Sequence, residues 1–213
     1  MIEAGYSNIG IVSFTKVAAQ ELKIRLEKEL SPEIVNAHVK ISTFHSMMLN
    51  HLRQYLVGTG LVSTDYETTH MLSILKNHNI QSHRLEDFRK YFTLEESERT
   101  DEQDFYSPWK EYLSDVLSKQ HITLSNVVSI GTEMILKGRI PPLPFSYLCV
   151  DEFQDSDNEQ IKLLLVHGLS GISIVCVGDD DQALYGFRNA KGVEAFRSIQ
   201  HKLGANKFIL STN

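Results

Sequence analysis

The sequence is poor in cysteine and proline and contains no long apolar run. Two cysteines and five prolines occur among 213 residues, and both cysteines, Cys149 and Cys176, lie within apolar runs. This pattern excludes a fold built on disulfides and is typical of small buried thiols in a reducing compartment, so we predict a cytoplasmic protein. No apolar run approaches the roughly 20 residues that a membrane span requires. Residues 1–3 do not begin a signal peptide, and no membrane association is expected.

The chain also lacks an excess of positive charge. Lys and Arg number 21, Asp and Glu number 27, and the net charge is −6. A uniformly basic coat for nucleic acid is thereby excluded, and any binding of a polyanion has to come from local geometry. Apolar residues make up 42% and charged residues 23%, values that are ordinary for a globular domain with a hydrophobic core. A disordered chain is excluded by the same composition.

Short apolar runs alternate with amphipathic segments at both ends of the chain. Strands are expected over residues 9–14, 39–43, 145–150 and 172–177, and a last strand is expected to begin at 207–210. Helices are expected over residues 17–30, 46–56 and 158–169. In the first of these helices apolar residues recur at the spacing of one helix face. Such alternation predicts an α/β fold in which helices connect the strands of a parallel sheet.

The middle of the chain, residues 57–144, has a different texture. It is polar and charged, with helical patches expected over 66–76, 85–91, 109–119 and 124–136. An acidic run at 93–104 is interpreted as a solvated loop or helix face, and the proline-rich segment 140–144 closes the zone. We therefore predict one α/β domain made of residues 1–56 and 145–213, with residues 57–144 inserted as a helical subdomain.

Two acids follow directly on the strand expected at 145–150. Asp151 and Glu152 would stand at the carboxyl end of a parallel sheet, where ligands bind in open α/β folds. The pair suits a nucleotide–magnesium site, with Asp151 as the ligand of a hydrated Mg²⁺. Glu152 would orient and deprotonate a water molecule aimed at the γ-phosphate. An Asp-Glu pair is equally common as the cap of a following helix, so these two residues alone leave both interpretations open.

The strand expected at 172–177 delivers a second polar segment to the same edge. Gln182 carries an amide able to sense a γ-phosphate or an attacking water. Tyr185, Phe187 and Arg188 combine two aromatic rings with a cation, a set that stacks unpaired bases and holds a phosphate. The alternative is that the two rings are core residues of a turn between strand and helix.

Together, these two segments resemble motifs of the UvrD/Rep-type superfamily 1 DNA helicases. The stretch DEFQD (151–155) is similar to that family's magnesium-and-water motif. The stretch GDDDQALYGFR (178–188) is similar to the motif that couples the γ-phosphate to single-stranded DNA. The resemblance implies a RecA-like sheet of the P-loop NTPase type, ATP and Mg²⁺ as cofactors, and Gln154 and Asp155 as further nucleotide-binding residues.

Two segments near the N-terminus extend the resemblance. VSFTKVAAQEL (12–22) is similar to the family's TFTNKAA segment, and TFHS (43–46) is similar to its TFH motif. The DNA-binding residues that the resemblance implies are Thr15, Lys16, Thr43, Phe44, His45, Tyr185, Phe187 and Arg188. A threonine at a helix start is well placed for a phosphate. Helix capping is the plain alternative for Thr15 and Ser46, and a structural histidine is the alternative for His45.

Other parts of the family pattern are not found in the sequence. The phosphate-binding loop GxGKT does not occur, and residues 209–213 match only the first part of the family's LxxNYR motif. The DFDDL-like sequence at the end of the family's insertion is replaced by TLSNV (123–127). Phosphoryl transfer depends almost wholly on positioning and charge neutralisation. We therefore expect no ATP hydrolysis from this chain by itself.

The resemblance thus implies that the chain is part of an ATP-dependent DNA helicase that moves 3′ to 5′ along single-stranded DNA and acts at duplex junctions. The alternative is a degenerate, ATP-independent module that binds single-stranded DNA or a protein. An in-frame GxGKT upstream of Met1 would favour the helicase, and a stop codon there would favour the binding module. A nucleotidase unrelated to DNA is disfavoured, because such an enzyme has no use for the rings of Tyr185 and Phe187 beside Arg188.

Overall fold

A four-stranded parallel sheet forms the centre of the α/β part of the molecule. The computed structural model describes residues 7–56, 60–92, 94, 96–119, 121–179 and 191–209. The strands, in the sheet order β2-β1-β5-β6, are β2 (Val39–Ser42), β1 (Ile9–Val12), β5 (Tyr147–Val150) and β6 (Ser173–Cys176). Because β1 pairs with both β2 and β5, segments from the two ends of the chain join in one sheet. The predicted α/β fold with a parallel sheet is confirmed.

Helices supply the connections that parallel strands require. Those of the sheet-bearing part are α1 (Lys16–Leu30), α2 (Pro32–His38), α3 (Phe44–Tyr55), α7 (Val127–Leu136), α8 (Asn158–Leu169) and α9 (Val193–Leu203). A 3₁₀ turn, η4 (Phe153–Asp155), follows β5 directly. The prediction for α3 placed its start two residues too late, because Thr43 caps this helix and Phe44 is already helical.

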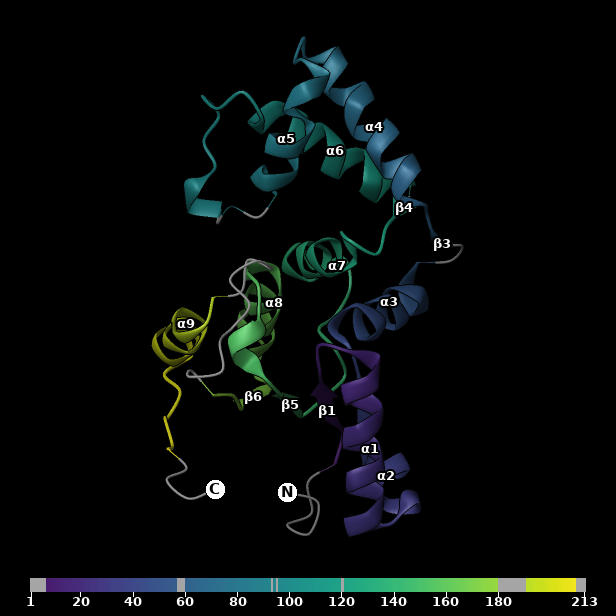
Figure 1. Ribbon diagram of the computed structural model, residues 1–213, viewed down its shortest axis with the longest axis vertical. Coiled ribbons are helices and arrows are strands. Elements are labelled where there is room, and N and C mark those ends of the chain that lie inside the picture. Colours follow the sequence, from purple (N-terminus) through teal and green to yellow (C-terminus); the bar gives the residue numbers. More distant parts are fainter. Residues whose placement is uncertain are drawn as a thin grey trace.

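A second group of helices stands apart from the sheet (Figure 1). We term it the helical body, and its elements are α4 (Thr64–Asn77), η2 (Ser82–Arg84), α5 (Leu85–Tyr91), η3 (Glu96–Glu98) and α6 (Tyr106–Lys119). Two short parallel strands, β3 (Gly60–Leu61) and β4 (His121–Ile122), form the neck that joins it to the rest. The domain boundaries at residues 57 and 144 stay a prediction.

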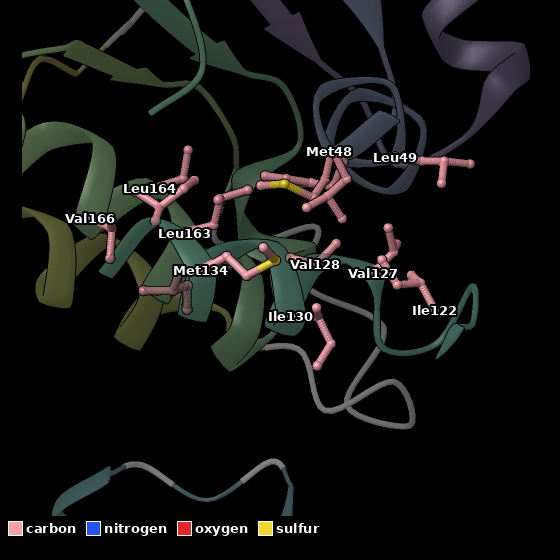
Figure 2. Close-up of a cluster of buried hydrophobic side chains, with 14 of the residues drawn as sticks. Met48, Leu49, Ile122, Val127, Val128, Ile130, Met134, Leu163, Leu164 and Val166 are labelled. Atoms are coloured by element: carbon pink, nitrogen blue, oxygen red, sulfur yellow. The ribbon is translucent and has the colours of Figure 1, made fainter. Parts of the chain in front are cut away.

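The main hydrophobic core lies where α7 packs on α3 and α8. Figure 2 shows Met48 from α3, Val128 and Met134 from α7, and Leu163 from α8 gathered between these helices. The sequence of α7 is apolar on most of its faces, as expected of a helix buried all round. Gly131 permits the close approach of α3, because a Cβ atom there would lie 2.1 Å from Met48 Sδ.

The last expected strand is wrong over the residues that the structure describes. Residues 207–209 form no strand, and Phe208 and Ile209 are 87% and 78% exposed. A run of high β-propensity becomes a strand only where another strand edge lies beside it, and the described part of this run pairs with none. Leu210 lies outside the described residues.

The two cysteines are free thiols on neighbouring strands, both half-buried. Burial raises the pKa of Cys149 and raises that of Cys176 to about 12, so both thiols stay protonated at neutral pH. Within the described ranges, no group of three or more His, Cys, Asp or Glu side chains is arranged to hold a metal ion. The same ranges contain no helix both long enough and apolar enough to cross a bilayer.

Candidate functional site

The carboxyl ends of the four strands meet at one edge of the sheet. Beyond the strand ends, Asp151 N donates to Val12 O at 3.0 Å and Val177 N donates to Val150 O at 2.9 Å. The backbone ladder therefore continues into the loops and keeps them side by side. We term this edge the rim, and it consists of residues 13–15, 43–45, 151–155 and 177–179.

Asp151 and Glu152 stand together on the rim, as the sequence predicts. Asp151 is half-buried and Glu152 is exposed. Burial and the neighbouring charge of Glu152 both raise the pKa of Asp151. Such a carboxylate is stabilised in its ionised form by a bound cation.

Glu152 has a left-handed backbone, with φ 51° and ψ 42°. This conformation costs about 1–2 kcal/mol for a residue with a side chain. It turns the chain sharply from β5 into η4, and the Glu152 side chain is exposed at this turn on the rim. Strained backbone of this kind is concentrated at functional sites, where the surrounding structure enforces it.

Gln154 connects the loop after β5 to the loop after β6. Its Nε2 donates to Glu152 Oε2 at 2.7 Å, and its Oε1 accepts from Asp179 N at 3.2 Å. The side chain is 2% exposed, so both of its polar ends are used inside the protein. In this structure Gln154 orients Glu152, a role that sequence reasoning missed. The nucleotide contacts predicted for Gln154 and for the half-buried Asp155 stay predictions.

Gly178 provides the space that Gln154 occupies. A Cβ atom at this position would lie 2.2 Å from Gln154 Oε1 and 3.0 Å from the backbone nitrogen of Phe153. We expect Gly178→Ala to displace Gln154 and to lower the free energy of unfolding by about 1–3 kcal/mol, as overpacking does. Urea denaturation measures the loss, with Ser173→Ala at an exposed position of β6 as the control. Equal stability of the two variants would contradict the packing described.

Thr15 and Thr43 occupy equivalent places at the starts of α1 and α3. The Thr15 hydroxyl accepts from Ala18 N at 3.0 Å, and the Thr43 hydroxyl accepts from Ser46 N at 3.3 Å. Both threonines therefore act as N-caps here, a role that the sequence left open as the alternative for Thr15. The first N–H groups of a helix have no partner within it and attract phosphate, so capping and DNA contact are compatible.

The other predicted DNA residues near the N-terminus differ in accessibility. Lys16 opens α1 and is exposed, whereas Phe44 is 2% exposed and packs edge-on against Phe14, with ring centroids 5.8 Å apart. His45 is half-buried. Burial lowers the pKa of His45, against the opposing effect of the Asp157 charge. Lys16 and His45 can thus meet a ligand without rearrangement, and Phe44 cannot.

A cavity of about 460 Å³ lies between the helical body and the starts of α7 and α8. His45 lines it from α3, and the helical body contributes Glu67 from α4 and Arg89 from α5. Residues 157–160, which follow the acids of the rim along the chain, form part of the opposite wall. Both its size and its mixture of apolar and polar lining are typical of ligand sites.

Apart from Gly178 and Asp179, the second predicted motif lies outside the described residues. Gln182, Tyr185, Phe187 and Arg188 all lie outside the described residues, and their roles stay predictions. The described residue nearest to them on the N-terminal side is Asp179, which belongs to the rim.

Comparison with known proteins identifies relatives over most of the chain. The UvrD/REP helicase N-terminal domain family matches residues 2–134 and 142–203. An ATP-dependent DNA helicase Rep from Buchnera aphidicola subsp. Acyrthosiphon pisum is 28% identical, over 89% of this chain and 33% of its own length. An ATP-dependent DNA helicase PcrA from Bacillus subtilis is 27% identical, over 86% of this chain and 28% of its own length. The chain thus spans about a third of the length of these curated relatives.

The family match agrees with the architecture. It covers all four strands of the sheet and the four segments of the rim, together with the helical body between them. The chain therefore belongs to the UvrD/REP helicase N-terminal domain family.

Proposed function

We propose that this chain is the ATP- and DNA-handling part of a helicase motor that moves 3′ to 5′ along single-stranded DNA and acts at duplex junctions. The rim carries the proposal, because four strands deliver two acids and two helix starts to one edge of the sheet. The Rep and PcrA relatives are named ATP-dependent DNA helicases, which supports ATP use by the intact protein.

The acids of the rim suit a magnesium ion that arrives with a nucleotide. In nucleotide sites Mg²⁺ is held by one or two carboxylates together with water and phosphate oxygens, so a larger cluster of acids is not needed. Asp151 would hold the ion, which when bound neutralises charge on the phosphates. Glu152, held by Gln154, would orient the attacking water and accept its proton.

The accessible groups at the helix starts would hold the single strand. Thr15 and Lys16 place a hydroxyl, an ammonium group and backbone N–H groups at one end of α1. His45 continues this surface toward the cavity. Because the whole chain carries a net charge of −6, we expect DNA binding by the isolated chain to be weak and sensitive to salt.

Removal of one cation from this surface tests the DNA contact. The log of the affinity for oligothymidylate falls as the log of the salt concentration rises. Lys16→Ala in the intact helicase is expected to make this negative slope shallower by about 0.7, the value for one phosphate contact on a single strand. Fluorescence anisotropy over a salt series measures the slope. Lys28→Ala, in the last turn of the same helix, is the matched control. An unchanged slope in Lys16→Ala would count against the contact.

ATP hydrolysis distinguishes the helicase from the second candidate, an ATP-independent binding module. The absence of GxGKT from this sequence is the observation that favours the module. An intact helicase should hydrolyse ATP faster when oligothymidylate is added, whereas this chain alone should show no hydrolysis. DNA binding by the intact protein with no ATP hydrolysis, with or without DNA, would establish the module instead.

A further inference from the structure

Glu67 is a buried carboxylate at the point where the helical body meets the neck. It lies in the first turn of α4 and is 6% exposed. Its two oxygens accept four hydrogen bonds, all from neutral side chains. Oε1 accepts from Tyr112 Oη at 2.9 Å, Thr123 Oγ1 at 2.8 Å and Asn126 Nδ2 at 3.4 Å, and Oε2 accepts from Ser125 Oγ at 2.8 Å. We term these five residues the Glu67 cluster.

The donors of the Glu67 cluster come from two different parts of the molecule. Tyr112 lies on α6 within the helical body, whereas the other three donors lie in the segment 123–126 between β4 and α7. That segment is closed on itself, because Thr123 N donates to Asn126 Oδ1 at 2.8 Å and Asn126 N donates to Thr123 Oγ1 at 3.2 Å. Glu67 thus fastens the helical body to the turn from which α7 begins.

The neck by itself is a slender connection. Its strands β3 and β4 pair over two residues each, and one more backbone bond, from Val62 N to Ile122 O at 2.8 Å, extends the pairing. An isolated two-stranded ribbon is marginally stable at best. The angle between the helical body and α7 therefore depends on contacts beside the neck, and the Glu67 cluster, of which all but Ser125 are buried, lies there.

The Glu67 cluster is also part of the cavity wall. Glu67, Tyr112, Ser125 and Asn126 all line the cavity, whose far side is formed by His45 and the start of α8. We propose that Glu67 is a positioning residue, which holds the helical body at a fixed opening over the cavity. If a single strand of DNA runs beside His45, this opening also controls how well the strand binds there. That consequence rests on the proposed function.

Hydrogen exchange followed by mass spectrometry tests the positioning role without DNA. In Glu67→Ala, amides of residues 60–67 and 121–127 should exchange about tenfold faster or more, because several buried donors lose their acceptor. The amides of α3 and α8 should keep their protection. In Glu67→Gln the same amides should exchange much more slowly than in Glu67→Ala, because the side-chain oxygen of the glutamine still accepts hydrogen bonds from the cluster. Asp65→Ala, at an exposed position two residues away, is the control and should match the wild type.

Two results would overturn the positioning role. One is faster exchange throughout α3 and α8, which would make Glu67 a general stabiliser of the fold. The other is no change at the neck. If Glu67→Ala does not fold, Ser125→Ala serves instead, because Ser125 is exposed and its hydroxyl bonds only within the cluster, to Glu67 Oε2 and to Thr123 Oγ1, each at 2.8 Å. Unchanged exchange at the neck in that variant would also overturn the role.

A DNA measurement on the intact helicase separates this inference from the proposed function. Glu67→Ala should weaken oligothymidylate binding by about tenfold, and Glu67→Gln should restore most of it, since its shape and acceptor are kept. Faster exchange at the neck with unchanged DNA affinity would support the positioning role and contradict the passage of DNA beside the cavity.

Discussion

Glu152→Gln is expected to slow ATP hydrolysis by the intact helicase by about 10²–10⁴-fold, the usual contribution of a general base. The substitution removes the basic oxygen and keeps the size of the side chain. The new amide oxygen can still accept from Gln154 Nε2, so the bond that orients residue 152 is preserved. ATP binding and single-stranded DNA binding should therefore change little while turnover is lost.

Steady-state hydrolysis with oligothymidylate, together with binding of a fluorescent ATP analogue, measures both parts of this expectation. Glu194→Gln is the matched control, because Glu194 is an exposed carboxylate in the first turn of α9 and is not part of the rim. Hydrolysis at the wild-type rate in Glu152→Gln would refute the assignment of the base. Loss of nucleotide binding as well would show that Glu152 holds the nucleotide rather than activating water.

Acidification from pH 6.5 to about pH 4 is expected to cost the fold about 3 kcal/mol through His167, at 1.36 kcal/mol for each pH unit. His167 is fully buried on α8, and its ring links the proline-rich segment 140–144 to that helix by a hydrogen bond. Its Nδ1–H donates to Leu163 O at 2.7 Å, and its Nε2 accepts from Leu143 N at 2.9 Å. Both ring nitrogens are thus occupied by the neutral tautomer, and protonation of Nε2 would set it against the Leu143 N–H.

The direction of the effect follows from the two pKa values. Burial lowers the pKa of His167 from 6.5 to about 4 in the folded protein. Between these values the unfolded chain binds the proton and the folded chain does not, so the free energy of unfolding falls as the pH falls. His51, which bonds Pro141 O at 2.8 Å and whose pKa burial also lowers, acts in the same direction.

Urea denaturation at pH 7 and pH 4.5 measures this loss. Because carboxylates titrate in the same range, the informative quantity is the difference between the wild type and His167→Gln, which lacks the titrating ring. The variant should be less stable at pH 7 and should lose less stability on acidification. His83→Gln, at an exposed position of η2, is the control and should follow the wild type. An equal loss in wild type and His167→Gln would show that His167 does not carry the effect.

The strand that leads to the acids was predictable because its information is local. An apolar run that stops at polar residues marks where a strand leaves the core, so residues 145–150 placed Asp151 and Glu152 at the sheet edge. The helix start at Thr15 was recognisable for a similar reason, since a capping residue acts on backbone three positions along, whereas the start of α3 after Thr43 was placed two residues too late. The motifs around these residues also identified the family that the comparison establishes.

Contacts between distant parts of the chain were beyond such reasoning. In the sequence Glu67 looks no different from Asp65 on the same helix turn, yet its donors lie 45 to 59 residues further along the chain. Gln154 and Gly178, and the ring of His167 against Leu143, meet in the same way across segments that only the folded sheet and helices bring together. Residues 207–209 show the converse, because their β-propensity meets no neighbouring strand in the part of the chain described.

Periodicity and capping depend on a few adjacent residues, so the sequence was enough to place the four strands of the sheet, several of the helices and the two acids. The partners of a buried polar group depend on every segment that folding brings near it. Tertiary structure alone therefore decided that Glu67 accepts hydrogen bonds from both sides of the neck, that Gln154 orients the predicted base, and that His167 is buried in its neutral form.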